Sequence, residues 1–320
     1  MRKTVLTAIA ALGTGAAVAL SAGLSTAQPK AAPAAPAAPA AAWQQVGDDI
    51  KSGISGLAVT SHSGGDRFSA LVVRDNKRPG ENRLAEVTYR PGADAEVAPI
   101  AWQGAAEPID LEALDRVPGT SDEYVAVASR GLAYHLKADA TEKAVKVLDI
   151  SPLPAIGEGD DYESFSLTSQ NGKLAALWAD RGAGKKRPAT VHAAPFSFNS
   201  YGEAEFGKVE KTTFRAPYPS GDVRHISDID VTKSGRVLVS SASDSGDDGP
   251  FDSAVSDAGK LSVSGTGKVR LSLAKSPELL KKFKGHKIEA VHCVPGSPSA
   301  ALGTDDENAG GSVTTSPLCG

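Results

Sequence analysis

Cysteine is scarce in this sequence: Cys293 and Cys319 are the only two among 320 residues. Their spacing fits neither a zinc-finger motif nor the Cys-x-x-Cys motif of redox proteins. In an exported chain, an isolated pair of cysteines is typical of a disulfide. We therefore predict that the two are bonded, which would tie down the C-terminus and stabilise the fold by roughly 3 kcal/mol in the chain-entropy model.

Several familiar catalytic motifs are absent as well. The sequence contains no Gly-x-Ser-x-Gly nucleophile elbow, no His-Glu-x-x-His zinc helix and no dinucleotide-binding glycine pattern. The segment nearest to a phosphate-binding loop, residues 182–186, lacks both the glycine spacing and the Ser/Thr after the lysine. The absence of these motifs does not exclude a serine hydrolase built on another scaffold, because catalytic triads are defined by geometry rather than by sequence position.

No large basic patch is present either. The formal net charge is −4, and it becomes −6 once Arg2 and Lys3 are removed with a leader peptide. Nucleic acid and anionic membrane surfaces are therefore not expected as partners.

The N-terminus has the pattern of a processing segment. Arg2 and Lys3 precede an uncharged run rich in Ala, Leu and Val, and Ser25, Thr26 and Ala27 give the small-x-small pattern of a signal-peptidase site. We predict a signal peptide over residues 1–27, with an uncleaved membrane anchor as the alternative. Residues 28–42 are almost entirely Pro and Ala and predict an extended linker. The folded domain then covers residues 43–320, and we expect it to be secreted and extracellular.

Helix signals are scarce in this domain. The best amphipathic candidate is the short segment 276–284. The rest of the chain consists of short apolar segments broken by Gly, Pro, Asn and Asp, which predicts an all-β fold.

A short acidic signature recurs along these predicted strands. Its acids are Glu112, Glu163, Asp230 and Glu289, which lie 51, 67 and 59 residues apart, and a degenerate first copy has Ser55 in the acid's place. Self-similarity at periods of about 40 residues or more is typical of propellers and solenoids. We predict a β-propeller with five blades, one for each copy.

The sequence is also compatible with two other folds. The 67-residue interval leaves room for a sixth blade, and a β-sandwich is the second candidate fold. The last repeat is short, so we expect residues 43–50 to supply a strand that closes the ring.

The strand order predicts where polar groups gather. After each signature strand come a turn, a returning strand and a polar loop. The predicted turns are Pro118-Gly119, Asn171-Gly172, Ser234-Gly235 and Pro295-Gly296. In an antiparallel hairpin, the start of the first strand and the end of the second lie at the same edge of the sheet. The signature acids and the loops after the second strands should therefore face one mouth of the propeller channel.

Two parts of the repeat permit a family comparison. Residues 288–291 followed by 303–311 resemble the closing repeat of secreted propellers with esterase-like or phytase-like domains, and residues 110–113 and 71–77 resemble earlier repeats of that group. The resemblance implies metal-assisted attack on phosphate or carboxyl esters.

Carboxylate and amide oxygens from separate repeats are suited to Ca²⁺, which takes roughly six to eight oxygen ligands. The candidate metal ligands are Glu112, Glu163, Asp230, Glu289, Asp75, Asp180 and Asp305, with Asn76, Asp306 and Asn308 as further rim donors. The alternative role for a signature acid is to bind backbone amides of the neighbouring blade and hold the ring together.

His225 and His286 precede two of the signatures and are the candidate general acids or bases, because histidine titrates near neutral pH. Arg130 and Arg181 follow second strands and are candidate anion-binding groups at the rim, with ordinary surface charge as the alternative.

The sequence thus predicts a secreted monomeric propeller with an acidic, Ca²⁺-binding mouth, possessing phosphoesterase or esterase activity towards a small-molecule ester. The alternative is a non-catalytic propeller that recognises a ligand or protein outside the cell.

Overall fold

The computed structural model describes residues 42–320. The predicted signal peptide and nearly all of the predicted linker lie outside this part of the chain. The described residues form an all-β domain with two short 3-10 helices, η1 (Ile50–Ser52) and η2 (Glu307–Ala309). Among them, no helix is long and apolar enough to cross a membrane.

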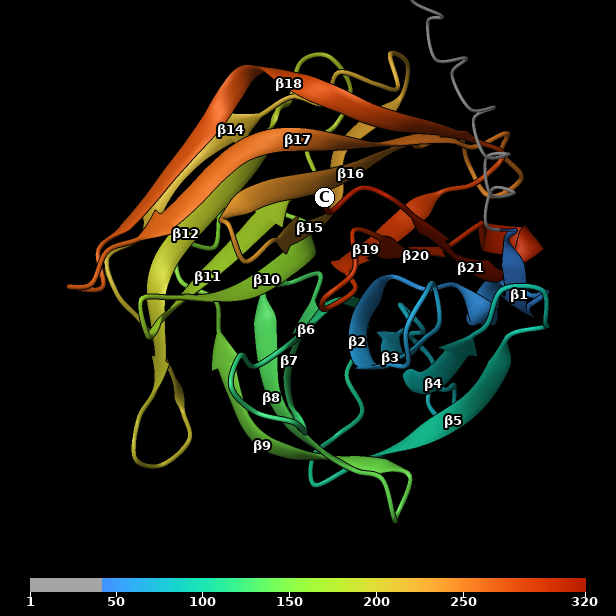
Figure 1. Ribbon diagram of the computed structural model, residues 1–320, viewed down its shortest axis with the longest axis horizontal. Coiled ribbons are helices and arrows are strands. Elements are labelled where there is room, and N and C mark those ends of the chain that lie inside the picture. The colour runs from blue at the N-terminus through green and yellow to red at the C-terminus, as the bar shows by residue number, and fades with distance from the viewer. Residues whose placement is uncertain (1–41) are drawn as a thin grey trace, which may run out of the picture. The chain divides into compact units, whose positions relative to one another are not determined.

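The strands form five antiparallel blades around a channel (Figure 1). Blade 1 contains β2 (Gly56–His62), β3 (Phe68–Val73), β4 (Leu84–Tyr89) and β5 (Glu96–Gln103). Blade 2 contains β6 (Leu111–Arg116), β7 (Glu123–Ala128), β8 (Leu132–Asp139) and β9 (Ala144–Pro152). Blade 3 contains β10 (Tyr162–Gln170), β11 (Lys173–Asp180), β12 (Ala189–Phe198), β13 (Ala204–Phe206) and β14 (Glu210–Phe214). Blade 4 contains β15 (Val223–Val231), β16 (Arg236–Ser243), β17 (Asp252–Val263) and β18 (Val269–Lys284). Blade 5 contains β19 (Ile288–Cys293), β20 (Ala300–Thr304), β21 (Gly311–Ser316) and β1 (Gln44–Gly47).

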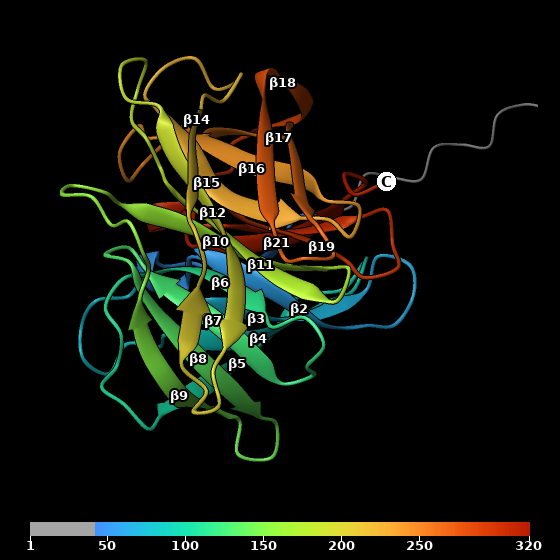
Figure 2. The same cartoon turned by 90° about the vertical axis from the view of Figure 1, so that its left-hand side faces the viewer.

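The innermost strands β2, β6, β10, β15 and β19 contact one another in a closed ring. This arrangement confirms the predicted propeller and excludes the β-sandwich. The side view shows blade 4 and blade 2 on opposite sides of the ring (Figure 2). Outer strands β5 and β9 also pair in parallel, which joins the sheets of blades 1 and 2 at their outer edges.

The N-terminal strand closes the ring, as the short last repeat predicted. β1 pairs antiparallel with β21, with Gln44 opposite Val313. The last blade therefore takes strands from both ends of the domain, so that unravelling either end would expose the edge of a sheet.

The 67-residue interval between signature acids does not contain a sixth blade. Blade 3 instead carries two outer strands, because β13 and β14 pair with different parts of β12.

The hairpin turns are formed by the predicted residues. Asn171 and Gly172 both have positive φ angles, of 53° and 69°, as a tight turn between twisted antiparallel strands requires. Segment 276–284, which had the best helical pattern, is the second half of β18 and pairs with β17. The helix prediction was wrong because this pairing overrides a weak local preference.

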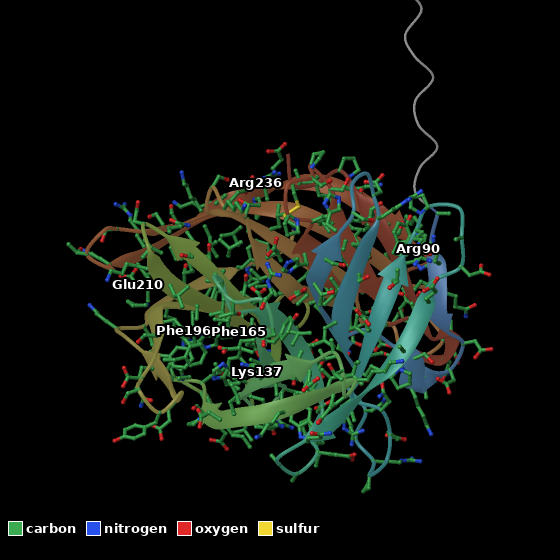
Figure 3. The ribbon with its side chains drawn as sticks, turned by 60° about the horizontal axis from the view of Figure 1, so that its bottom comes forward. Arg90, Lys137, Phe165, Phe196, Glu210 and Arg236 are labelled. Atoms are coloured by element: carbon green, nitrogen blue, oxygen red, sulfur yellow. A yellow bond between two sulfur atoms is a disulfide. The ribbon has the colours of Figure 1, made fainter. Side chains whose placement is uncertain are left out.

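The core consists mainly of small and branched apolar residues between adjacent blades. Between blades 2 and 3 the core contains large aromatic side chains: Phe165 and Phe196, labelled in Figure 3, belong to one cluster with Trp178. The predicted disulfide between Cys293 and Cys319 is present, with the two Cα atoms 5.8 Å apart. Arg236 donates to the carbonyl oxygens of Leu318 and Gly320, which further fixes the C-terminus.

Candidate functional site

Three inner strands carry a bulge at the signature acid. The pairing register shifts around Glu112 in β6, around Glu163 in β10 and around Glu289 in β19. A bulge leaves one residue outside the regular ladder and re-aims its side chain. In this propeller the three bulges bring the glutamates together at the channel.

Carboxylate oxygens of Glu112, Glu163 and Glu289 lie within 4.8 Å of one another. The exposed fraction is 9% for Glu112 and 3% for each of the others. Asp75, Asp110 and Glu112 form a second group of the same tightness, so Glu112 belongs to both. Blades 2, 3 and 5 therefore each supply a carboxylate to one place, as the repeat predicted.

These acids line a cavity of about 230 Å³, which we call the acid cavity. Every lining residue is charged: Asp75, Lys77, Asp110, Glu112, Asp161, Glu163, Arg181, Arg224, Lys287, Glu289, Asp305 and Glu307. Eight acids face four bases, which gives the lining a formal charge of −4.

Two buried bases neutralise part of this charge. Arg224 Nη1 lies 2.9 Å from Glu289 Oε1 and 3.7 Å from Glu163 Oε2. Lys287 Nζ lies 3.0 Å from Glu289 Oε1 and also pairs with Glu307. The neighbouring acids raise the pKa of both bases despite their burial, so both stay charged.

Glu112 differs from the other two glutamates because no basic group of residues 42–320 lies within 4.0 Å of its carboxylate. Burial, followed by the charges of Glu163 and Glu289, raises the pKa of Glu112 well above its usual value. Burial also raises the pKa of Glu163 to about 8, although Arg224 opposes the shift. The cavity therefore holds protons near neutral pH unless another cation replaces them.

The loops after the second strands contribute as predicted in two blades. Asp75 follows β3 and Asp305 follows β20, and both line the acid cavity. Burial raises the pKa of Asp75 to about 6, and it raises the pKa of Asp305 well above its usual value, with the charge of Glu289 adding to both shifts. Blade 1 has Ser55 at its signature position, so it supplies its carboxylate through the loop residue Asp75.

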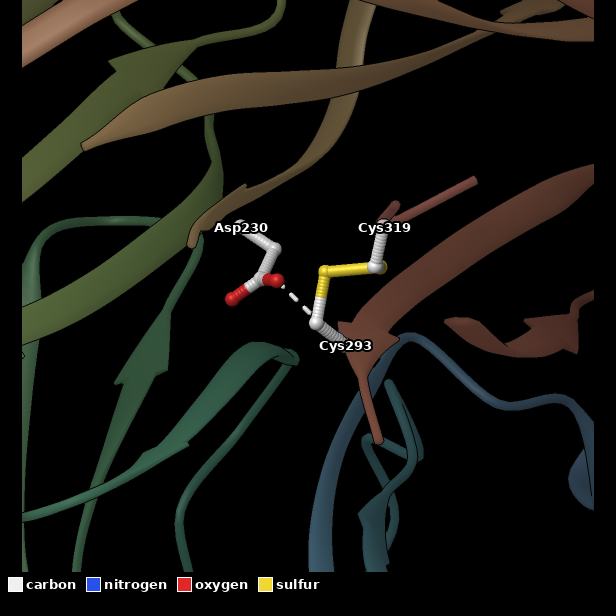
Figure 4. A group of neighbouring side chains, drawn as sticks. All are labelled: Asp230, Cys293 and Cys319. Atoms are coloured by element: carbon white, nitrogen blue, oxygen red, sulfur yellow. Dashed lines mark hydrogen bonds between the residues drawn. A yellow bond between two sulfur atoms is a disulfide. The ribbon is translucent and has the colours of Figure 1, made fainter. Parts of the chain in front are cut away.

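Asp230 does not join this group, contrary to the sequence prediction. β15 begins at Val223, and its register shifts between Arg224 and Asp228, so Arg224 occupies the mouth and Asp230 lies near the other end of the strand. There Asp230 Oδ2 accepts a hydrogen bond of 2.9 Å from the backbone amide of Cys293 (Figure 4). Asp230 thus has the alternative role, in which an acid binds the backbone of the neighbouring blade.

Asp180 also lies outside the lining of the acid cavity. Its Oδ1 accepts from the Gly182 amide at 2.9 Å, and its Oδ2 pairs with Arg187 at 2.9 Å. Both oxygens therefore organise the loop after β11. Its neighbour Arg181 lines the cavity and contacts Asp161 at 3.1 Å.

The two candidate catalytic histidines are not part of the cavity lining either. His225 Nε2 lies 2.8 Å from the Gly184 carbonyl, and its Nδ1 accepts from the Ala216 amide at 3.1 Å. His286 Nδ1 lies 2.9 Å from Asp306 Oδ2, and its ring is tilted against Trp43 at 4.2 Å. The geometry therefore gives His225 no free ring nitrogen for proton transfer and gives His286 a structural partner.

The remaining rim candidates have structural contacts as well. Asn76 donates to the carbonyls of Lys51 and Asn82, Asp306 accepts from the Lys287 amide, and Asn308 donates to Asp248.

Sequence reasoning missed Arg224, Lys287 and Asp110 as members of the site. Lys287 lies two residues before Glu289, and Asp110 two before Glu112, so each stands directly before the strand that carries a signature acid. That spacing was a usable signal. No sequence signal marked Arg224 as part of the site, because the acids later in β15 match the signature better.

No protein-family model and no curated protein matches this chain. Several solved structures are similar in fold. One is a GH43 β-1,3-galactosidase solved with galactodeoxynojirimycin, at 10% identity and a TM-score of 0.44, covering 83% of this chain and 90% of that one. Another is the GH43 BlXynB protein from Bacillus licheniformis, at 14% identity and a TM-score of 0.42, covering 73% of this chain. This chain spans 46% of that protein's length.

Proposed function

We propose that the acid cavity binds a divalent cation, most suitably Ca²⁺. The observation that carries the proposal is the convergence of Glu112, Glu163 and Glu289 within 4.8 Å of one another, while no basic group of residues 42–320 lies within 4.0 Å of the Glu112 carboxylate. Buried carboxylates without counter-charge are costly, and a bound cation relieves that cost.

The charge of the lining favours a cation over an anion. Arg224 and Lys287 are already committed to Glu163, Glu289 and Glu307. When its carboxylates are ionised, the whole lining carries a formal charge of −4, which repels phosphate and carboxylate ligands and attracts a divalent ion.

The donor set favours Ca²⁺ among common divalent ions. The cavity lining offers carboxylate oxygens but no thiol or imidazole, and such hard donors suit Ca²⁺ or Mg²⁺ rather than Zn²⁺. Asp75 and Asp305 come from loops and add donors at irregular positions, which suits the flexible coordination of Ca²⁺ better than the octahedral demand of Mg²⁺.

Thermal unfolding of the full chain at pH 8 with 5 mM Ca²⁺ and with chelator tests this proposal. We expect a higher melting temperature with Ca²⁺, because a ligand that binds the folded state stabilises it. In Glu112→Gln the melting temperature should be the same with Ca²⁺ and with chelator. Mg²⁺ should raise the melting temperature of the wild-type protein less than Ca²⁺ does. An unchanged melting curve of the wild-type protein in millimolar Ca²⁺ would contradict the proposal.

Ester hydrolysis assisted by the bound cation is a second candidate function. It is favoured by carboxylates with different surroundings in one cavity: Glu112 and Glu163 would hold the cation, whereas Glu289 is paired with two bases. The cation would polarise the ester, and Glu289 would be the general base that activates water.

Turnover of p-nitrophenyl phosphate and p-nitrophenyl acetate with Ca²⁺ tests the enzyme hypothesis. We expect one ester class to be hydrolysed, with activity lost in both Glu112→Gln and Glu289→Gln. If Ca²⁺ stabilises the protein but neither ester is hydrolysed, the alternative of a non-catalytic, cation-loaded recognition module is favoured.

A further inference from the structure

The other end of the channel holds a cavity of about 460 Å³, which is larger than the acid cavity. It is formed where the inner strands β6, β10, β15 and β19 end and their hairpin turns begin, and we call it the second mouth. Glu112 and Asp115 lie on the same inner strand at its two ends, roughly 10 Å apart at about 3.3 Å per residue. The second mouth is therefore distinct from the acid cavity.

Two buried carboxylates line the second mouth, and each is fixed by the next blade. Asp115 Oδ2 accepts from the Leu167 amide at 2.7 Å and from Ser166 Oγ at 3.1 Å. Asp230 is 6% exposed and uses only Oδ2, for the Cys293 amide. Its Oδ1 has no hydrogen-bond partner among the described residues, and in Figure 4 this second oxygen points away from the disulfide.

The rest of the lining is mixed rather than uniformly charged. Pro118, Leu167, Val231, Val294 and Pro295 line the cavity together with the disulfide. Binding sites for small organic molecules combine such an apolar wall with a few fixed polar groups, within volumes of roughly 300–1,000 Å³.

We propose that the second mouth binds a small organic cation, with its primary ammonium group at Asp230 and Asp115 and its apolar body against the prolines and the disulfide.

The contacts of the two acids support an ammonium group over other ligands. Arg116 and Lys233 also line the cavity, but neither forms an ion pair within 4.0 Å in the described part of the chain, so the acids are not neutralised by them. His292 Nδ1 lies 3.8 Å from Asp115 Oδ1 and is the nearest titratable partner. An ammonium group supplies three donors to the free Asp230 oxygen and to neighbouring acceptors.

A metal ion suits this cavity less well. Cys293 and Cys319 lie near Asp230, but their sulfurs are joined in the disulfide and are not thiolate ligands. One free carboxylate oxygen and a distant imidazole do not make a coordination shell of the usual number.

Titration of the full chain with n-pentylamine at pH 7.5 tests the proposal, by calorimetry and by the NMR signals of the His292 imidazole. We expect saturable binding, shifted His292 signals and at least tenfold weaker affinity in Asp230→Asn. This variant keeps an oxygen for the Cys293 amide and replaces the free, charged oxygen with an NH2 group. Asp228→Asn, an adjacent buried acid outside the cavity lining, is the matched control and should bind normally. The neutral analogue 1-pentanol should bind more weakly.

Three results would overturn the proposal: no saturable binding of pentylamine, equal affinity for pentylamine and 1-pentanol, or unchanged affinity in Asp230→Asn. Loss of binding in Glu112→Gln would place the amine in the acid cavity and would also overturn it. If Asp230→Asn does not fold, the His292 signals of the wild-type protein decide: unshifted signals in the presence of amine contradict the site.

Discussion

The two ends of the propeller channel use buried acids in opposite ways. At the acid cavity, Glu112, Glu163 and Glu289 stand in bulges and face one another. Further along the same ring of strands, Asp115, Asp228 and Asp230 accept hydrogen bonds from backbone amides of the next blade. The first group accumulates charge, whereas the second group holds the blades together.

The difference shows that an acid's role depends on its place relative to the bulge. Inside the regular part of an inner strand, a carboxylate meets unpaired amide groups of the neighbouring strand and satisfies them. In a bulge, the side chain is released towards the channel. Burial does not separate the two roles, since both groups are almost fully buried.

The largest effect should come from removing a blade-bridging acid. Asp228 accepts from the Val291 and Ile229 amides at 2.8 Å each. Asp228→Ala leaves two buried donors unsatisfied and should lower the free energy of unfolding by about 3 kcal/mol, as measured in urea. Asp228→Asn should cost less, because the amide oxygen keeps one of the two hydrogen-bond acceptors. A loss below about 0.5 kcal/mol in the alanine variant would mean that bridging acids do not hold the ring.

The opposite result is expected for the acid cavity. Glu112→Gln removes a carboxyl group whose ionisation is disfavoured by burial and by the neighbouring acids, so the metal-free protein should be more stable at pH 8 by about 1 kcal/mol. The same variant should bind Ca²⁺ at least tenfold more weakly, which corresponds to about 1.4 kcal/mol. Unfolding in chelator and Ca²⁺ titration measure the two effects. If the metal-free Glu112→Gln variant is less stable than the wild-type protein, the acids at the two ends of the channel do not have the opposite roles described here.

The pH dependence should separate the metal-free and metal-bound states. The pKa of Glu163 is about 8 in the folded protein and near 4.5 in the unfolded chain. The unfolded state therefore loses its proton first, and the stabilisation by the bound proton, complete below pH 4.5, is lost as pH rises through 8. In chelator, the melting temperature should fall by about 2–4 °C or more between pH 6 and 9.

Ca²⁺ should abolish this fall, since the ion replaces the bound protons and binds more tightly at higher pH. Glu163→Gln provides the matched control and should show a flatter profile in chelator. A melting temperature in chelator that rises between pH 6 and 9 would contradict the account of the acid cavity.

The smallest effect is expected at the rim. Lys77 Nζ lies 2.9 Å from Asp110, but the lysine side chain is 60% exposed. Lys77→Ala should change the free energy of unfolding by less than about 0.5 kcal/mol, because exposed ion pairs contribute little. Removing a positive charge beside the cavity should tighten Ca²⁺ binding by roughly twofold. Weaker binding in this variant would show that Lys77 organises the site rather than competing with the ion.

Much of the architecture was predictable from the sequence. The repeat of Glu112, Glu163 and Glu289 marked three blades and their common mouth, and the short last repeat indicated that residues 43–50 would close the ring. Turn residues such as Asn171 and Gly172 specified the hairpins through their positive φ angles. These signals are local, so they can be recognised in one sequence.

The features that the sequence did not predict depend on the register between paired strands and on contacts made in the folded chain. The shift in β15 put Arg224 at the mouth and moved Asp230 to the second mouth, and no local pattern records such a shift. Similarly, His225 is close in sequence to a signature, yet the folded backbone occupies both of its ring nitrogens. Segment 276–284 has a helical pattern, but its long pairing with β17 makes it a strand.

Calorimetric titration of the full chain with Ca²⁺ at pH 8, for wild type and for Glu112→Gln, tests the central claim most directly. The account predicts saturable binding in the wild-type protein with release of protons, and at least tenfold weaker binding in the variant. Absence of saturable binding in the wild-type protein at millimolar Ca²⁺, or equal affinity in the two proteins, would contradict it.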